Sequence, residues 1–110
     1  MSTTTLTSIG QAFNMAALVS CQPDSVVSRT LIDKKVGTLT LFAFDAGQGL
    51  SEHTAPFDAV VQIIEGTASV TIDGAVHQVT AGEMIIMPAN IPHSLKAEVP
   101  FKMLLVMIRA

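Results

Sequence analysis

The sequence predicts one all-β domain, built as a closed barrel or a two-sheet sandwich. Three observations predict it: short runs rich in apolar and β-branched residues, turn residues between these runs, and no long segment with helical periodicity. The length of 110 residues is that of one ordinary domain, and a hydrophobic fraction of 49% is sufficient for one core. We therefore expect residues 1–110 to form a single domain.

The expected elements follow one another along the chain with turn residues between them. Residues 1–8 are rich in Ser and Thr and are expected to be poorly ordered, whereas residues 9–19 are expected to form a short helical turn. Alternating or wholly apolar runs then predict strands over residues 26–33, 36–45, 60–65, 68–73, 76–80, 84–87, 93–98 and 101–108.

Glycine positions indicate how these strands are connected. Gly47 and Gly49 indicate a loop between the second and third predicted strands. The strands on either side of Gly66 are expected to pair as a hairpin. Asp73 and Gly74 form a strong two-residue turn signal, so the strand after them is expected to pair back on the strand before them.

Charge and composition exclude several classes of partner. The formal net charge is -3 and there is no run of Lys or Arg, so we expect neither nucleic-acid nor membrane binding. No apolar run approaches the roughly 20 residues that a membrane-spanning helix needs. Cys21 is the only cysteine, which precludes an internal disulfide and favours a cytoplasmic location. We expect Cys21 to be a small buried hydrophobic residue.

Two groups of residues have a recognisable spacing, within residues 47–66 and 82–97. The matching positions are Gly47, His53, Gly66, Gly82, Pro88 and His93. They resemble the two motifs of the cupin family, in which a glycine precedes a histidine pair and a glutamate, and a second glycine precedes a proline and a further histidine. The resemblance implies a small single-domain cupin with the double-stranded β-helix fold, also called a jelly-roll barrel.

The resemblance also implies a metal site, which is incomplete in this sequence. Cupins commonly use three histidines and a glutamate to hold a divalent transition metal such as Fe, Mn, Zn, Ni or Cu. Here Ala55 and Ala59 stand at two of the four ligand positions, so only His53 and His93 remain as metal-ligand candidates. A tightly held divalent metal generally needs three or four protein ligands. No cofactor is therefore firmly predicted.

Strand periodicity predicts what surrounds the two histidines. Residues two apart on a strand share a face, so the inward face of the barrel is expected to form an apolar cup with two imidazoles. A barrel of about eight strands can hold one small ligand. The residues expected to line this ligand site are His53, His93, Asn90, Val61, Ile63 and Leu95.

Three functions are compatible with such a cup. The first is binding of a small molecule whose polar group is oriented by His53 and His93. The second is a metal-dependent oxygenase, isomerase or decarboxylase with a reduced ligand set, in which either histidine would also be a candidate acid or base. The third is a structural dimer module with an empty cup.

Other residues have simpler expected roles. His77 is expected on a sheet surface outside both motifs. Four methionines are expected to fill the core, although their soft thioethers would suit copper(I) if they converged: Met84, Met87, Met103 and Met107. The N-terminal strands and the apolar C-terminal strand are expected to offer sheet edges, and the cupin resemblance implies a homodimer.

Overall fold

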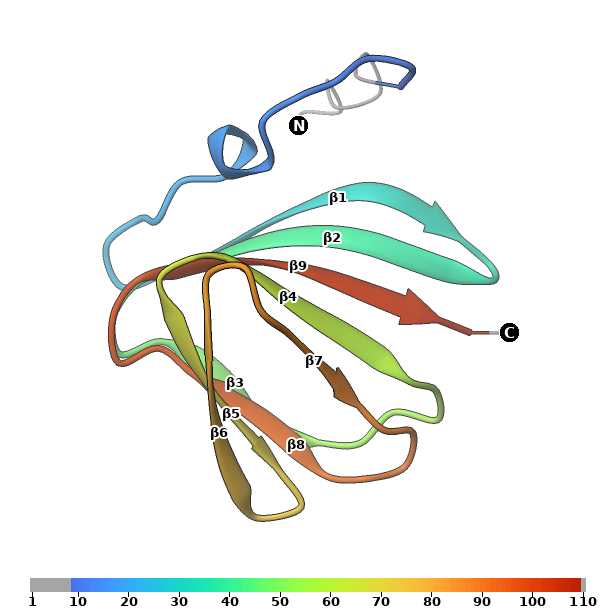
Figure 1. The fold of residues 1–110 in the computed structure, drawn as a ribbon, viewed down its shortest axis with the longest axis vertical. Helices are drawn as coiled ribbons and strands as arrows, with labels where there is room; N and C mark the ends of the chain where they lie inside the picture. The colour runs from blue at the N-terminus through green and yellow to red at the C-terminus, as the bar shows by residue number, and fades with distance from the viewer. Residues whose placement is uncertain (1–8, 110) are drawn as a thin grey trace.

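Two β-sheets close around one interior in a computed structural model of the protein, which describes residues 9–109 (Figure 1). Within that range the strands are β1 (Val26–Lys34), β2 (Gly37–Phe44), β3 (Gly49–His53), β4 (Ala59–Glu65), β5 (Thr67–Ile72), β6 (Ala75–Thr80), β7 (Met84–Met87), β8 (His93–Lys96) and β9 (Phe101–Ile108). One sheet has the order β1-β2-β9-β4-β7 and the other the order β3-β8-β5-β6. The predicted all-β double-stranded β-helix is confirmed. The expectation for residues 1–8 falls outside the described residues.

The hairpin predicted at Asp73 and Gly74 is present between β5 and β6. Ile72 pairs with Ala75, so two residues form the loop. Both loop residues have left-handed backbone angles, with φ of +50° at Asp73 and +81° at Gly74. These are the values that a type I′ turn requires, which explains why an Asp-Gly pair closes this hairpin.

The hairpin expected around Gly66 does not form. β4 lies in the five-stranded sheet and β5 in the four-stranded sheet, so the chain passes from one sheet to the other at this residue. Gly66 has φ of +77°, and an added Cβ would meet the carbonyl oxygen of Pro100 and would lie 3.0 Å from Cβ of Phe101. Gly66 alone turns the chain at this point, directly against residues 100 and 101. Only glycine fits here, because it has no Cβ and readily adopts a positive φ.

Two further expectations about the strands are wrong. The loop expected around Gly47 and Gly49 ends earlier than predicted, because residues 49–53 form β3. The side chains of β3 are mostly exposed and lack the apolar alternation that marks a strand. The C-terminal strand β9 was expected at an edge but lies between β2 and β4. Its apolar character reflects a central position in the sheet, where both faces are covered.

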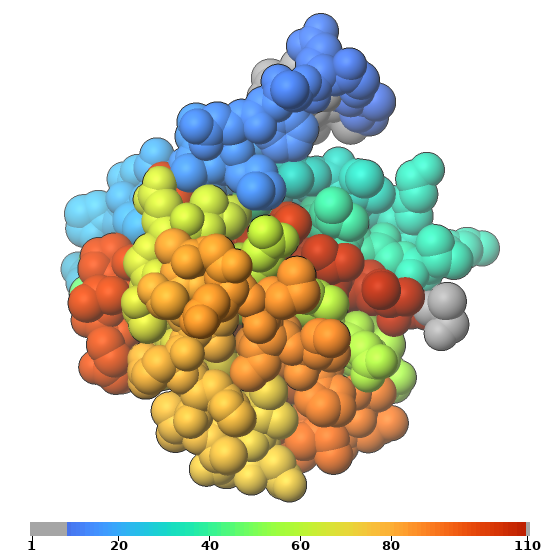
Figure 2. Space-filling view, in the orientation of Figure 1, coloured from blue at the N-terminus to red at the C-terminus, as the bar shows by residue number. Residues whose placement is uncertain are grey.

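Residues 15–21, before β1, pack on the outer face of the five-stranded sheet. Figure 2 shows the described part of this segment in blue, along one side of the molecule. The segment contains a short 3₁₀ helix, η2 (Met15–Leu18), in the region where a helical turn was expected. The side chain of Asn14 caps this helix by accepting a 3.0 Å hydrogen bond from Ala16 N. Lys102 on β9 donates to the Ala16 carbonyl at 2.7 Å and so ties the segment to the sheet. No helix among residues 9–109 has the length and apolar character to cross a membrane.

The main core lies between the two sheets and is filled by aromatic and branched side chains. Phe44 and Phe101 are both buried, and their rings stack with centroids 4.5 Å apart. Val61 and Ile63 on β4 belong to the same buried cluster. Because side chains fill this part of the interior to close packing, the space for a ligand is confined to the remainder.

Candidate functional site

A small cavity of about 50 Å³ lies between the two sheets. Its lining comes from five strands and from the loop after β3, and consists of Leu50, His53, Ala55, Ala59, Met87, His93, Leu95, Met103, Leu105 and Met107. A cavity of this volume has room for a metal ion, for a few waters or for a small group of a larger ligand.

The two histidines meet because β3 and β8 are antiparallel neighbours. His53 and His93 are cross-strand partners in this pair, and Leu50 is the partner of Leu95. The register shifts between Leu50 and His53, which marks an irregularity in β3. In a regular strand, residues three apart point to opposite faces. The irregularity instead allows both residues to line the cavity, as β-bulges do when they redirect a side chain.

Backbone carbonyls orient both imidazole rings. Nδ1 of His53 lies 2.8 Å from the carbonyl oxygen of Ser51, and Nδ1 of His93 lies 3.2 Å from that of Ile91. The two Nε2 atoms lie 3.2 Å from each other, with the rings inclined at 76°. A carbonyl oxygen only accepts hydrogen bonds, so each Nδ1 has to carry its proton for these contacts to be favourable.

This arrangement is one proton short when both rings are neutral. Two neutral imidazoles carry two N–H groups, whereas the three contacts need three. If both Nδ1 atoms are protonated, the lone pairs of the two Nε2 atoms face each other. The pair of His53 and His93 is therefore completed by an electron-pair acceptor, which is either a proton or a metal ion.

The two rings differ in their surroundings. His93 is buried, with 3% of its surface exposed, whereas His53 is exposed and lies at the mouth of the cavity. Burial lowers the pKa of His93 below its usual value, and a positive charge on His53 lowers it further. The hydrogen bond to the Ile91 carbonyl acts in the opposite direction. His93 is therefore a neutral ligand or acceptor near neutral pH.

Comparison with known proteins identifies the family. The sequence model of the cupin domain matches residues 40–108, which is more than half of the chain. The protein belongs to the cupin family. Cupins often bind small molecules or transition metals. No curated protein matches the chain in sequence.

Several solved structures are closely similar to that of this cupin. A conserved protein of unknown function from Streptococcus pyogenes is 38% identical with a TM-score of 0.88, and the match covers 92% of this chain and 89% of that chain. A cupin 2 conserved barrel domain protein from Leptotrichia buccalis is 39% identical with a TM-score of 0.85, over 87% of this chain and 47% of that chain. A cupin superfamily protein from Desulfitobacterium hafniense, 24% identical with a TM-score of 0.87 over 92% and 93%, shares the fold.

The structure brings some of the predicted site residues of this cupin together but not others. His53, His93 and Leu95 line the cavity. Val61 and Ile63 do not, because they follow Ala59 along β4 into the filled part of the interior, where they are 0% and 1% exposed. They share the inward face, as strand periodicity indicates, but periodicity does not say how deep the open part of the barrel reaches.

Asn90 also lies outside the cavity lining. Its side chain is on an exposed turn, and its backbone has φ of +65°, a conformation that asparagine tolerates better than most residues. Its N–H donates a 2.7 Å hydrogen bond to the carbonyl of Ala55. Asn90 thus holds the loop after β3 against the turn before β8, and contributes to the site through its backbone.

The usual cupin metal site does not fit the residues present. Ala55 and Ala59 both line the cavity beside the two histidines, where they offer no lone pair. Among residues 9–109, no group of three or more His, Cys, Asp or Glu side chains is placed to hold a metal ion. Two imidazoles fall short of the three or four ligands that hold a divalent ion tightly.

Five residues that line the cavity were not predicted from the sequence to do so. Leu50, Met87, Met103, Leu105 and Met107 all contribute to the cavity. The spacing of Met103, Leu105 and Met107 at every second position on one strand is a signal that would have placed them on one face. Met84, in contrast, is 58% exposed and lies elsewhere.

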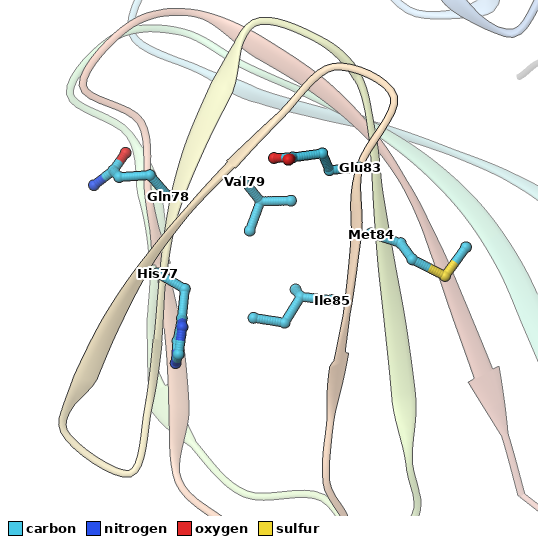
Figure 3. Close-up of a pocket in the computed structure, with 6 residues that line it drawn as sticks. All are labelled: His77, Gln78, Val79, Glu83, Met84 and Ile85. Atoms are coloured by element: carbon cyan, nitrogen blue, oxygen red, sulfur yellow. The ribbon is translucent and has the colours of Figure 1, made fainter.

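A second, more open hollow of about 460 Å³ lies between β6 and β7 (Figure 3). Val79 and Ile85 face each other across it, His77 and Glu83 lie at different ends, and the side chain of Met84 extends away from it. His77 is exposed, as expected. Although this hollow is larger, its polar groups do not converge, so the two-histidine cavity is the better candidate site.

Proposed function

We propose that this cupin binds a small ligand through the imidazole pair of His53 and His93. The observation that supports the proposal is the pair of Nε2 atoms 3.2 Å apart, which needs one electron-pair acceptor to be complete. The other lining residues are apolar. They strengthen a polar interaction made in the cavity, because a hydrogen bond is electrostatically stronger where the local dielectric constant is low. Two polar groups in an otherwise apolar cavity are typical of a binding pocket.

A small carboxylic acid supplies what the pair lacks. The O–H bond of the acid breaks, the proton is shared by the two Nε2 atoms, and the resulting carboxylate lies beside a pair that carries one positive charge. His53 is exposed, so a carboxylate next to it keeps access to solvent. The volume of about 50 Å³ limits the buried part of the ligand to a few atoms, and any larger part extends past His53.

A metal-dependent oxygenase, isomerase or decarboxylase is the weaker alternative. Such an enzyme needs a tightly held divalent ion, and Ala55 and Ala59 remove two of the usual ligands. A purely structural module is also less well supported, because core packing gives no reason for two imidazoles to meet in an apolar cavity. Burial of polar groups costs free energy unless they make hydrogen bonds.

Thermal unfolding with small monocarboxylic acids at slightly acidic pH tests the proposal. A ligand that binds the folded state raises Tm in a concentration-dependent way. We expect this rise in the wild type and in His77→Ala, whose substituted side chain is exposed and outside the cavity, and its loss in His53→Ala. A rise that persists in His53→Ala, or no rise with any acid, would contradict binding of acids at the pair.

We also propose that the protein is a cytoplasmic homodimer. β1 is an outer strand of its sheet, and the exposed apolar side chains of Ile32 and Val36 lie at its end and in the turn that follows. Ile32 also lines an apolar hollow of about 310 Å³ between the N-terminal segment and β1–β2. Covering this edge with a second copy would protect it from aggregation. Light scattering of Ile32→Glu against the wild type tests this, with a monomer expected for the variant.

A further inference from the structure

We infer that the cavity is a copper(I) site in which Nε2 of His53, Nε2 of His93 and at least one methionine thioether coordinate the ion. The thioethers belong to Met87, Met103 and Met107, all of which line the same cavity as the imidazoles. This inference rests on the proposed function, because it uses the same imidazole pair. It goes further by naming a soft metal ion as a second acceptor, which would complete the pair in place of the proton of an acid.

Strand register explains why the methionines gather there. Ala59 on β4 pairs with Met87 on one side and with Met107 on the other, so the three residues form a row across β7, β4 and β9. The small side chain of Ala59 leaves space between the two longer ones. Met103 shares the face of Met107 because the two are four residues apart on β9. A position where cupins commonly have a glutamate is therefore flanked by two thioethers.

The donor set is soft and carries no charge. Among the described residues, the lining offers two imidazole nitrogens and three thioether sulfurs, and its other side chains are hydrocarbon. Thioether ligands select soft ions such as copper(I), and imidazole also binds copper, whereas magnesium, calcium and manganese prefer oxygen. Copper(I) also has the lower charge, and the cost of burying an ion grows with the square of its charge. A divalent ion has neither a carboxylate nor a thiolate here to offset that cost.

Orientation and size also agree with a metal ion. In each ring Nδ1 lies on a backbone carbonyl, as proteins commonly arrange a metal-binding histidine, and Nε2 is directed toward the other ring, where an ion could bind. His93 and Met87 are each 3% exposed and Met103 is fully buried, so the ion would be shielded from water on one side. The cavity of about 50 Å³ has room for a single ion beside the two rings.

Competition for copper(I) against a chromophoric chelator, without oxygen and with a reductant, tests the inference. We expect one copper(I) per wild-type chain, and sulfur as well as nitrogen neighbours in the X-ray absorption spectrum. The triple variant Met87→Leu, Met103→Leu and Met107→Leu keeps a similar volume, so it is expected to fold. Mutating a residue that only hydrogen-bonds to a metal ligand already weakens metal binding about 10–100-fold. The triple variant is therefore expected to bind at least that much more weakly.

Two matched variants make the result specific. Met84→Leu changes an exposed methionine outside the cavity and should bind copper(I) like the wild type. His53→Ala should lose binding, because His53 supplies one nitrogen. If the triple variant binds as tightly as the wild type, or the spectrum shows no sulfur neighbour, the methionines only pack the core and the inference is wrong.

The same material separates this inference from the proposed function. If copper(I) does not bind but small acids raise Tm in a manner that depends on His53, the copper inference fails and ligand binding at the imidazole pair stands. If neither copper(I) nor any acid binds in a manner that depends on His53, both proposals fail.

Discussion

The Nε2 atoms of His53 and His93 lie 3.2 Å apart, although 40 positions separate the two residues in the sequence. Antiparallel pairing of β3 with β8 makes this contact, and the irregularity in β3 directs His53 to the cavity. The two rings are not equivalent, since His93 is buried and His53 is exposed. Their substitution should therefore have different consequences for stability.

Replacing His93 by alanine should destabilise the protein, whereas replacing His53 should not. His93→Ala removes a buried ring and enlarges a cavity, so we expect a loss of about 1–3 kcal/mol in the free energy of unfolding. His53→Ala removes an exposed ring, for which a change within about 0.5 kcal/mol is usual. Urea denaturation of the two variants measures both values. Equal losses would mean that His53 is packed as firmly as His93.

The lowered pKa of His93 predicts how stability depends on pH. Burial and the neighbouring His53 make the folded protein bind a proton at His93 less readily than the unfolded chain does. As the pH falls below about 6.5, the usual pKa of histidine, the unfolded state takes up more protons at this residue than the folded state does. The stability that His93 contributes is therefore complete above about pH 6.5 and declines below it. The decline ends near the lowered pKa that His93 has in the folded protein.

Urea denaturation across that pH range checks this dependence. His93→Gln removes the titrating group. Its stability should therefore fall less steeply than that of the wild type between about pH 6.5 and the lower pH at which carboxylates become protonated. His77→Gln, at an exposed position outside the cavity, should follow the wild type. Parallel curves for the wild type and His93→Gln would show that His93 titrates alike in the folded and unfolded states.

The sequence predicts the fold of this protein better than its connections. Apolar runs and the Asp73–Gly74 turn indicate nearly all strands, because local periodicity and turn chemistry are properties of adjacent residues. The crossing between sheets at Gly66 is not predictable in this way. It depends on the approach of residues 100 and 101, which are distant in the chain.

The candidate site was predicted in part for the same reason. Motif spacing gives His53, His93 and the two alanine positions, since these lie within short segments. That Met87 and Met107 are both neighbours of Ala59 depends on long-range register between three strands. The depth at which the interior becomes filled, which excludes Val61 and Ile63 from the cavity, depends on aromatic side chains from elsewhere.

Gly66 and Gly74, two of the five positive-φ glycines among residues 9–109, should respond differently to substitution by alanine. Both have left-handed backbones, at +77° and +81°, so both variants incur the strain of about 1 kcal/mol that a Cβ brings. At Gly66 the added Cβ also meets the carbonyl of Pro100 and crowds Phe101, whereas at Gly74 nothing lies within 4 Å. We expect Gly66→Ala to cost at least about 1 kcal/mol more than Gly74→Ala in urea denaturation. Similar losses would imply that the chain adjusts freely at the sheet crossing.

Restoring the two missing ligands should create a divalent metal site. The variant Ala55→His with Ala59→Glu adds an imidazole and a carboxylate to a cavity that already holds His53 and His93, giving four ligands. We expect it to bind one Zn²⁺ or Mn²⁺ per chain by calorimetry, which the wild type should not do tightly. Without metal, a buried carboxylate lowers stability, so adding the ion should raise Tm by more than in the wild type.

A matched variant separates coordination by the carboxylate from a change of volume. Ala55→His with Ala59→Gln has nearly the same size but lacks the negative charge, which offsets much of the cost of burying a divalent ion. It should bind Zn²⁺ or Mn²⁺ clearly more weakly than the glutamate variant. If both variants bind equally, the carboxylate does not reach the ion, and the alanine at position 59 is not the reason why this cupin lacks the usual metal site.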